Sequence, residues 1–241
     1  MHRDLARRTS AELVGTALLV AIVVGSGIAA QRLSPGDTGL QLLANSIATG
    51  AGLIALILAL GPISGAHFNP VVTLADRLLG GTSTRDALAY AVAQTVGACL
   101  GAMVANLMFS LPAIEWSTET RSSGALWLGE FVATFGLLTV ILGVVRSGRA
   151  HAAAYAVGGY IAAAYWFTSS TSFANLAVTI GRTLTDTFAG IAPSSAPMFI
   201  VMQVGSALVA VALARFWRPS LRDADLVAPH DPDRPLAIDR E

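Results

Sequence analysis

Two asparagines stand at the start of short apolar segments, where their side chains can cap a helix and also bind a solute. Asn69 precedes Pro70, and Asn175 precedes Leu176. Asparagine is a strong N-cap residue and proline suits the first helical position, whereas leucine lacks the fixed φ of proline but forms helix well. A capping oxygen leaves the side-chain NH₂ group free to donate a hydrogen bond. The chemistry predicted at both positions is the binding of an oxygen atom of an uncharged molecule.

The composition places these asparagines in a membrane protein. The chain has 241 residues, of which 54% are hydrophobic and only 12% are charged, about half of the charged share of a soluble domain. The 15 acidic residues balance the 15 basic ones, all arginines, so no net charge attracts nucleic acid. One cysteine, Cys99, excludes an internal disulfide, and four scattered histidines give no metal-ligand cluster. We therefore expect no enzyme, no metal and no cofactor.

Six apolar runs are long enough to cross a bilayer, which takes ~20 helical residues. They lie at about 11–30, 40–61, 86–108, 125–146, 150–169 and 197–217. The first run follows three arginines and is similar to the apolar part of a signal peptide, but Glu12 and the five later runs favour a retained helix. We predict an all-α membrane protein with six transmembrane helices.

The arginines are shared unevenly between the two sets of segments that flank these spans. One set holds only Arg32, Arg121 and Arg182, and the other set holds the remaining arginines. The positive-inside rule places the arginine-rich set, and with it both termini, in the cytoplasm. Residues 1–10 are then a cytoplasmic N-terminus, residues 11–217 the membrane domain, and the charged, proline-broken residues 218–241 a disordered cytoplasmic tail.

The chain is an internal duplication, with halves at about 11–110 and 125–217. Segment 61–78 can be aligned with segment 168–184 on their asparagines, and the same division into two halves can be extended to the rest of the chain. Residues of the same type then fall at matching positions. The pairs are Ser64 with Ser170, Thr73 with Thr179, Glu12 with Glu130, and Gln94 with Gln203. Three spans in each half make the second half enter the membrane from the opposite side, which is an inverted repeat. The two aligned segments are too short to cross, so we expect two re-entrant half-helices that line a polar path.

If the two half-helix starts meet in the middle of the membrane, each brings roughly half a positive charge there. These charges would repel cations, hydronium included. The residues upstream of each asparagine would present a ladder of carbonyl acceptors; they are Gly65, Ala66, His67, Thr171, Ser172 and Phe173. An asparagine can also merely cap a turn in a packed loop, but two of them related by a repeat favour a pore.

The string SGAHFNPVVTLA, together with the duplication, resembles the major intrinsic protein family, the aquaporins and aquaglyceroporins. The hallmark of that family is Asn-Pro-Ala in each half, and the second copy here departs further from it than the first. The two copies are Asn69-Pro70-Val71 and Asn175-Leu176-Ala177. The resemblance implies an aquaporin-like fold, a homotetramer with one pore per subunit, and a place in a bacterial inner (plasma) membrane.

Glu12 and Glu130 stand early in the first and fourth spans, where a buried carboxylate needs hydrogen-bond donors. The resemblance implies that these glutamates brace the two half-helix loops. The alternative is a proton relay in a coupled transporter. We favour bracing because no further ionisable residue lies along the spans to continue a relay.

The resemblance also implies an outer constriction, and there this sequence departs from the family. Members usually carry an arginine three residues after the second asparagine, where this chain has Val178. Gap-free counting assigns the other three positions to Thr49, Ala163 and Ser172. This set has no ring and no guanidinium, so we expect a wide and weakly polar constriction. Arg182 is either a residue of the outer vestibule or a surface arginine near Asp186.

These features predict a passive channel for small uncharged solutes, such as water, glycerol-like polyols and metalloid hydroxides. Similarity to the bacterial aquaglyceroporin-like branch associated with arsenic resistance implies passage of arsenite as neutral As(OH)₃. Glycerol, urea and antimonite fit the same opening. Two alternatives stay open: an ion-coupled secondary transporter of the inverted-repeat type, and a non-conducting structural membrane protein that tolerates the loss of both asparagines.

Overall fold

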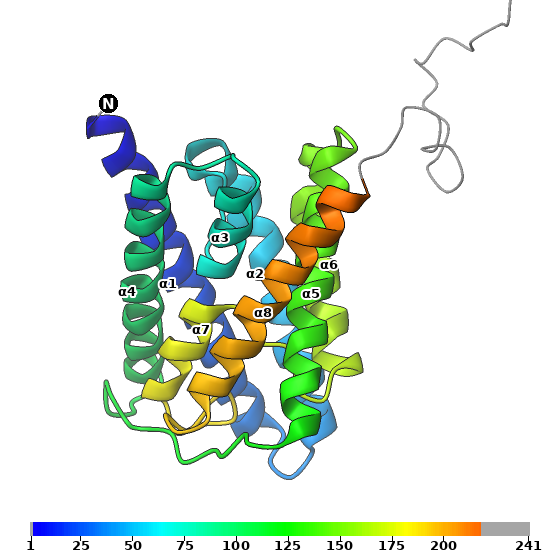
Figure 1. Ribbon diagram of the computed structural model, residues 1–241. Coiled ribbons are helices and arrows are strands. Elements are labelled where there is room, and N and C mark those ends of the chain that lie inside the picture. Colours follow the sequence, from blue (N-terminus) through cyan, green and yellow to red (C-terminus); the bar gives the residue numbers. More distant parts are fainter. Residues whose placement is uncertain (1, 218–241) are drawn as a thin grey trace, which may run out of the picture.

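The computed structural model describes residues 2–217, which form a bundle of helices standing side by side (Figure 1). The long helices are α1 (His2–Leu33), α2 (Thr38–Ser64), α4 (Thr84–Met108), α5 (Gly124–Arg146), α6 (Ala153–Phe167) and α8 (Ala196–Phe216). The short elements are α3 (Pro70–Leu78), α7 (Leu176–Gly181) and two 3₁₀ turns, η1 (Ala150–Ala152) and η2 (Arg182–Leu184). The described part of the chain contains no strand, as the sequence predicts.

The predicted spans correspond to helices, with one of them shorter than expected. Five helices, α1, α2, α4, α5 and α8, are long and apolar enough to cross a membrane. The predicted span 150–169 is divided between η1 and α6, and α6 has 15 residues. Residues 2–10, which the sequence predicts to be a cytoplasmic N-terminus, form the first turns of α1. The expected tail, residues 218–241, lies outside the described residues.

The two halves of the chain pack as two related groups of helices that interlock through the half-helices. α1 packs on α2 and α4, whereas α5 packs on α6 and α8. Both α3 and α7 contact α4 and α8, so each half-helix touches a long helix of the other half. The half-helices follow one another along the bundle, between the long helices (Figure 1). This arrangement is the predicted inverted repeat.

The close approach of α1 and α4 depends on two glycines of α4. A Cβ atom on Gly97 would lie 2.3 Å from the carbonyl oxygen of Leu13, and one on Gly101 would lie 2.2 Å from that of Ala17. Neither distance is possible for a real side chain, so any larger residue would push the two helices apart.

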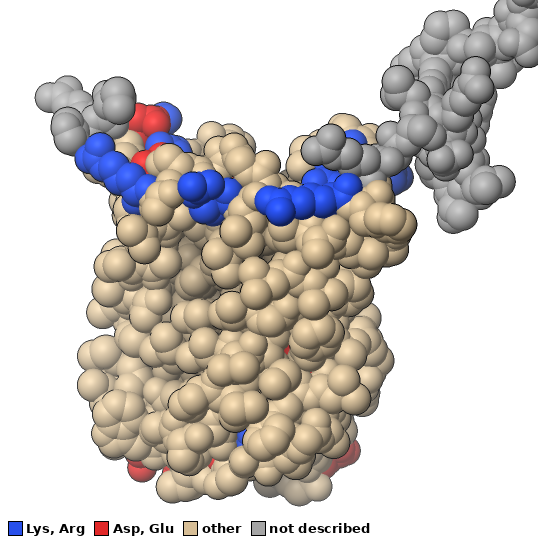
Figure 2. Space-filling model, in the orientation of Figure 1, with Lys and Arg blue, Asp and Glu red and all other residues tan. Residues whose placement is uncertain are grey.

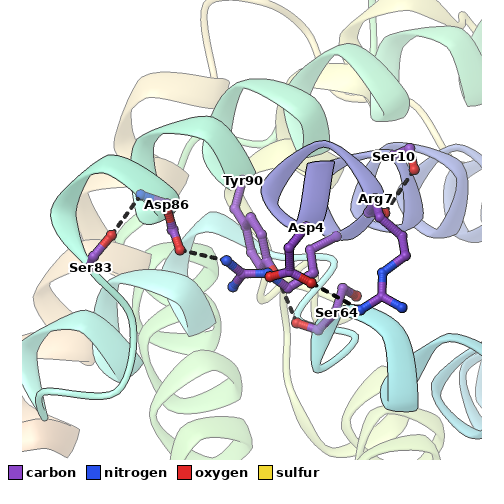
Figure 3. Close-up of polar contacts among 8 residues, drawn as sticks. Asp4, Arg7, Ser10, Ser64, Ser83, Asp86 and Tyr90 are labelled. Carbon is purple, nitrogen blue, oxygen red and sulfur yellow. Dashed lines mark hydrogen bonds and ion pairs between the residues drawn. The ribbon is translucent and has the colours of Figure 1, made fainter. Parts of the chain in front are cut away.

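Arginines gather at one end of the bundle, and the face seen in Figure 2 is almost free of charge between the two ends. At this arginine-rich end, Arg8 Nη2 lies 2.7 Å from Asp86 Oδ2 and joins α1 to α4. The Tyr90 hydroxyl donates to the carbonyl oxygen of Ser64 at 2.8 Å, which ties α4 to the end of α2 (Figure 3). These contacts fix the backbone immediately before the first re-entrant loop.

Candidate functional site

A cavity of about 280 Å³ lies between the two halves and is lined by residues of both. Ala153, Val157, Ile161 and Tyr165 all line it. These residues are spaced by four and therefore form one face of α6 over most of its length. The cavity thus runs along the helices, in the direction in which a solute would cross the bundle.

Asn69 and Asn175 join the two re-entrant loops by a reciprocal pair of hydrogen bonds. Asn69 Nδ2 donates to the carbonyl oxygen of Ala174 at 2.7 Å, and Asn175 Nδ2 donates to that of Phe68 at 2.8 Å. Both asparagines line the cavity. An amide NH₂ group has two hydrogens, so each asparagine donates one to the opposite loop and retains a second that can donate to a molecule in the cavity. The whole NH₂ group is therefore not free, contrary to our expectation.

The same two side chains also start the half-helices. Asn69 Oδ1 accepts from the amide of Val71 at 2.9 Å, and Asn175 Oδ1 accepts from the amide of Ala177 at 3.0 Å. Pro70 and Leu176 are the first residues of α3 and α7. Leucine in place of proline leaves the second cap in place, because the cap depends on the asparagine oxygen.

The backbone before each asparagine follows the same unusual path in both loops. Positive φ angles occur at Gly65 (90°), Ala66 (49°), Phe68 (48°), Thr171 (58°), Ser172 (53°) and Ala174 (47°). These positions lie four, three and one residues before each asparagine. Residues other than glycine rarely adopt such angles, and the strain persists only where the surroundings enforce it. Its repetition in both halves indicates that the path of the loops is a required feature.

Glu12 holds the first loop. Its carboxylate is 0% exposed and accepts hydrogen bonds from the amides of His67 at 3.0 Å and Phe68 at 2.7 Å. The Ser64 hydroxyl donates to it at 2.6 Å, and Gln94 Nε2 donates at 2.8 Å. The donors come from the end of α2, from the loop and from α4, so the carboxylate ties these three elements to α1.

Glu130 holds the second loop in the same way. Its carboxylate is 0% exposed and accepts from the amide of Phe173 at 3.1 Å and from that of Ala174. Gln203 Nε2 donates to it at 2.7 Å and also donates to the Thr179 hydroxyl at 2.8 Å. The repeat that pairs these residues in the sequence thus recurs as a pair of equivalent hydrogen-bond networks.

Three of the four residues counted into the outer constriction line the cavity, namely Thr49, Ser172 and Val178. Ala163 does not, because it lies on the exposed face of α6, and Tyr165 lines the cavity instead. Two residues rotate a helix by about 200°, so the gap-free count selected the opposite face. Tyr165 therefore adds to the cavity wall an aromatic ring that the gap-free count did not include.

Arg182 also lines the cavity and is only 3% exposed, so it is not a surface arginine. Its Cζ atom lies 3.5 Å from the centroid of the Phe173 ring, and its Nε donates to the carbonyl oxygen of Ala189. Asp186 instead accepts from the amide of Thr118 at 2.8 Å. Arg182 thus contributes a guanidinium to the cavity wall, whereas Val178 itself is aliphatic.

Five of the six residues of the predicted carbonyl ladder line the cavity; they are Gly65, Ala66, His67, Ser172 and Phe173. Thr171 is not among the lining residues. The sequence did not indicate the place of the Phe173 ring, which also lies 5.3 Å from Cζ of Arg121. Arg121 belongs to the segment between α4 and α5, and desolvation by burial lowers its pKa. Two guanidinium groups therefore lie against the Phe173 ring, and of these two Arg182 lines the cavity whereas Arg121 does not.

Comparison with known proteins decides the family. Residues 1–165 match the major intrinsic protein family. The chain is 51% identical over 213 residues to aquaglyceroporin AqpS of Rhizobium meliloti (strain 1021), which covers 88% of this chain and 91% of the relative. The chain belongs to the major intrinsic protein family. It is a multi-pass membrane protein of that family, as the resemblance implied.

Two further members of the family are similar to this chain. Aquaporin NIP1-4 of Oryza sativa subsp. japonica is 40% identical over 123 residues, which cover 48% of this chain and 44% of the relative. The X-ray structure of the aquaglyceroporin from Plasmodium falciparum superposes with a TM-score of 0.70 at 21% identity, covering 88% of this chain and 95% of that chain. This structural similarity supports the fold of the described residues.

Proposed function

We propose that the protein is a passive channel for small uncharged solutes, with one path through each chain. The observation that carries this proposal is the reciprocal pair formed by Asn69 and Asn175, which places two helix starts and two N–H donors in the wall of one cavity. The 51% identical relative, an aquaglyceroporin by name, supports the same function.

The midpoint selects for neutral solutes. The starts of α3 and α7 each bring roughly half a positive charge to the same region, which repels cations in a medium of low dielectric constant. The remaining N–H group of each asparagine donates to an oxygen of the solute. Loop residues upstream provide backbone acceptors, so a molecule with hydroxyl groups exchanges its hydration shell for contacts on both sides.

The solutes that fit this chemistry are water, glycerol-like polyols and metalloid hydroxides such as arsenite in its neutral As(OH)₃ form. Each offers hydroxyl groups and no net charge. The apolar part of the wall, formed by α5 and α6 side chains such as Leu137 and Ile161, suits the carbon backbone of a polyol. The channel works as a homotetramer in a bacterial inner membrane, with its arginine-rich end and both termini in the cytoplasm.

The two glutamates act as braces in this mechanism. The carboxylates of Glu12 and Glu130 each accept hydrogen bonds from a loop and from a neighbouring glutamine. These contacts give neither carboxylate a partner along the cavity with which it could exchange a proton. A coupled transporter would need one of them to gain and lose protons during each cycle.

Stopped-flow light scattering of proteoliposomes tests the proposal. We expect glycerol and arsenite fluxes that are bidirectional, non-saturating and unchanged when a proton gradient is imposed. Uphill accumulation driven by protons or sodium would establish the transporter instead. A protein that inserts correctly but adds no flux above that of empty liposomes would be the non-conducting structural protein.

A further inference from the structure

Resting on the proposed channel function, we infer that Asp76 keeps anions out of the path at the arginine-rich end of the molecule. Among the described residues that line the cavity, Asp76 is the only one with a carboxylate. It lies in the last turn of α3, two helical turns past Asn69, and Val72 lines the cavity between them on the same face. An oxyanion or a phosphate ester that enters from the cytoplasm must therefore pass a negative charge.

The two halves of the chain carry opposite charges at equivalent positions. Asp76 lies seven residues after Asn69. Arg182 lies seven residues after Asn175, so the internal duplication pairs the two charged residues, and both line the cavity. Because the halves are inverted and the asparagines meet, the two charges lie on opposite sides of the midpoint, each on the order of 10 Å away along a helix axis. The repeat keeps a charged side chain at this position but reverses its sign.

The other charges at this end of the path attract anions. The starts of α3 and α7 bring positive potential to the midpoint, which repels cations but draws anions. The arginines that gather at this end of the bundle add to the attraction (Figure 2). Arg77, Arg146 and Arg215 are exposed there and do not line the cavity. They raise the concentration of anions outside the mouth, whereas the carboxylate of Asp76 opposes the entry of anions into it.

A hydroxyl group holds the carboxylate of Asp76 in place. Thr82 donates from its hydroxyl to Asp76 Oδ2, and this neutral donor leaves the charge of the carboxylate intact. The amide of Gly81 donates to the carbonyl oxygen of Asp76 at 3.0 Å, so the chain turns back over the end of α3. A Cβ atom on Gly81 would lie 2.2 Å from Asp76 Oδ1. Glycine at that position thus leaves the room that the carboxylate occupies.

Helix stability does not account for an aspartate at this position. The C-terminal end of a helix carries partial negative charge, so a carboxylate in the last turn of α3 is unfavourable for the helix. Arg77, the next residue, is of the type that the same end favours. Departures from such local preferences are expected where a side chain serves function. The exclusion of anions supplies that function for Asp76.

The test compares Asp76→Asn with Asp4→Asn in planar bilayers under a potassium chloride gradient. Asparagine keeps an oxygen that can accept from Thr82, so the first variant removes the charge and preserves the hydrogen bond. Asp4 is the matched control, because it lies in the first turn of α1 near the same end and does not line the cavity (Figure 3). We expect Asp76→Asn to raise the chloride current several-fold and to shift the reversal potential towards that of chloride. Asp4→Asn should match the wild-type protein.

Three further variants separate the charge from the local structure. Asp76→Ser also removes the charge, should admit chloride in the same way, and decides the matter if Asp76→Asn fails to insert. Asp76→Glu keeps the carboxylate and should exclude chloride. Thr82→Val removes the hydroxyl donor but no charge, and it should exclude chloride as well.

Two outcomes would overturn the role of Asp76 while leaving the channel intact. One is chloride exclusion at the wild-type level in the inserted Asp76→Asn and Asp76→Ser proteins, with glycerol still passing in proteoliposomes. The other is an equal chloride current in Thr82→Val, which would show that the shape of the turn, and not the charge, keeps anions out. Absence of glycerol flux in the wild-type protein would instead refute the proposed function.

Discussion

The hydroxyl oxygens of Thr49 and Tyr165 lie 3.1 Å apart and join α2 to α6 beside the cavity. Both residues are buried, at 2% and 3% exposure. The small threonine on α2 thus faces a large ring on α6, and the ring supplies bulk that the four residues chosen by gap-free counting lack. We therefore predict that Tyr165 limits the size of the opening at this level more than any of the four residues that gap-free counting selected.

Replacing Tyr165 with alanine should widen the opening. We expect the flux of a four-carbon polyol relative to water to rise roughly fivefold or more, because pore diameter limits the larger solute most. Tyr165→Phe keeps the ring and should change this ratio much less. Ala163→Phe is the control, since Ala163 lies on the exposed face of α6. The assignment is wrong if the Ala163 variant alters selectivity and the Tyr165 variant does not.

The difference between Ala163 and Tyr165 shows where sequence reasoning stopped. The spans and the two half-helices were predictable because they depend on local signals: apolar length, and an asparagine that caps a helix. The inward face of α6 depends instead on the length and path of the connection to the second loop. If the length of that connection is misjudged by two residues, a residue on the outward face of the helix is assigned to the inward face.

The stacking of Arg182 on Phe173 was unpredictable for a related reason. It joins residues of a strained loop and a 3₁₀ turn, whose side-chain positions follow from packing and not from a repeating pattern. By contrast, the pairing of Glu12 with Glu130 was visible in the sequence because duplication preserved both residue type and spacing.

Replacing either buried glutamate with glutamine should destabilise the fold. One carboxylate oxygen of Glu12 accepts from Phe68 and Gln94, and the other accepts from His67 and Ser64. In Glu12→Gln an NH₂ group replaces one of these oxygens. Whichever oxygen is replaced, the new donor then faces two other donors. We expect a loss of ~2–4 kcal/mol. The midpoint of thermal unfolding in detergent should then fall by about 5–15 °C.

The matched control for this effect is Glu119→Gln, since Glu119 is exposed. Its free energy of unfolding should change by no more than about 0.5 kcal/mol. Equal melting temperatures for Glu12→Gln, Glu130→Gln and the wild-type protein would show that the carboxylates do not brace the loops.

Replacing a cavity asparagine with aspartate should admit cations. In Asn69→Asp or Asn175→Asp, a carboxylate cancels the positive potential of the helix starts and removes an N–H donor. We expect measurable potassium current across a planar bilayer. Asn45→Asp is the control, because Asn45 is similarly buried but does not itself line the cavity, and it donates to the carbonyl oxygen of Val23 and the hydroxyl of Ser26. Currents that stay at the wild-type level in both inserted cavity variants would exclude the asparagines from the conducting path.

Placing a guanidinium at Val178 should narrow the path. Val178 is 4% exposed, lines the cavity and lies one helical turn before Arg182. Val178→Arg adds a long cationic side chain below an existing one, so it takes up space and raises the barrier to cations. We expect glycerol flux in proteoliposomes to fall roughly fivefold or more, water flux to fall less, and residual proton leak to decrease.

Thr49→Phe should act in the same direction from the opposite wall. It fills space with a ring and removes the hydroxyl that contacts Tyr165. Because Thr49 and Val178 line one opening, the double variant should reduce glycerol flux by less than the product of the two single effects. Additive effects would indicate two separate barriers along the cavity. Wild-type passage of glycerol by both inserted single variants would mean that neither residue lies at the constriction, and the outer limit of the pore would then have to be sought nearer to Arg182.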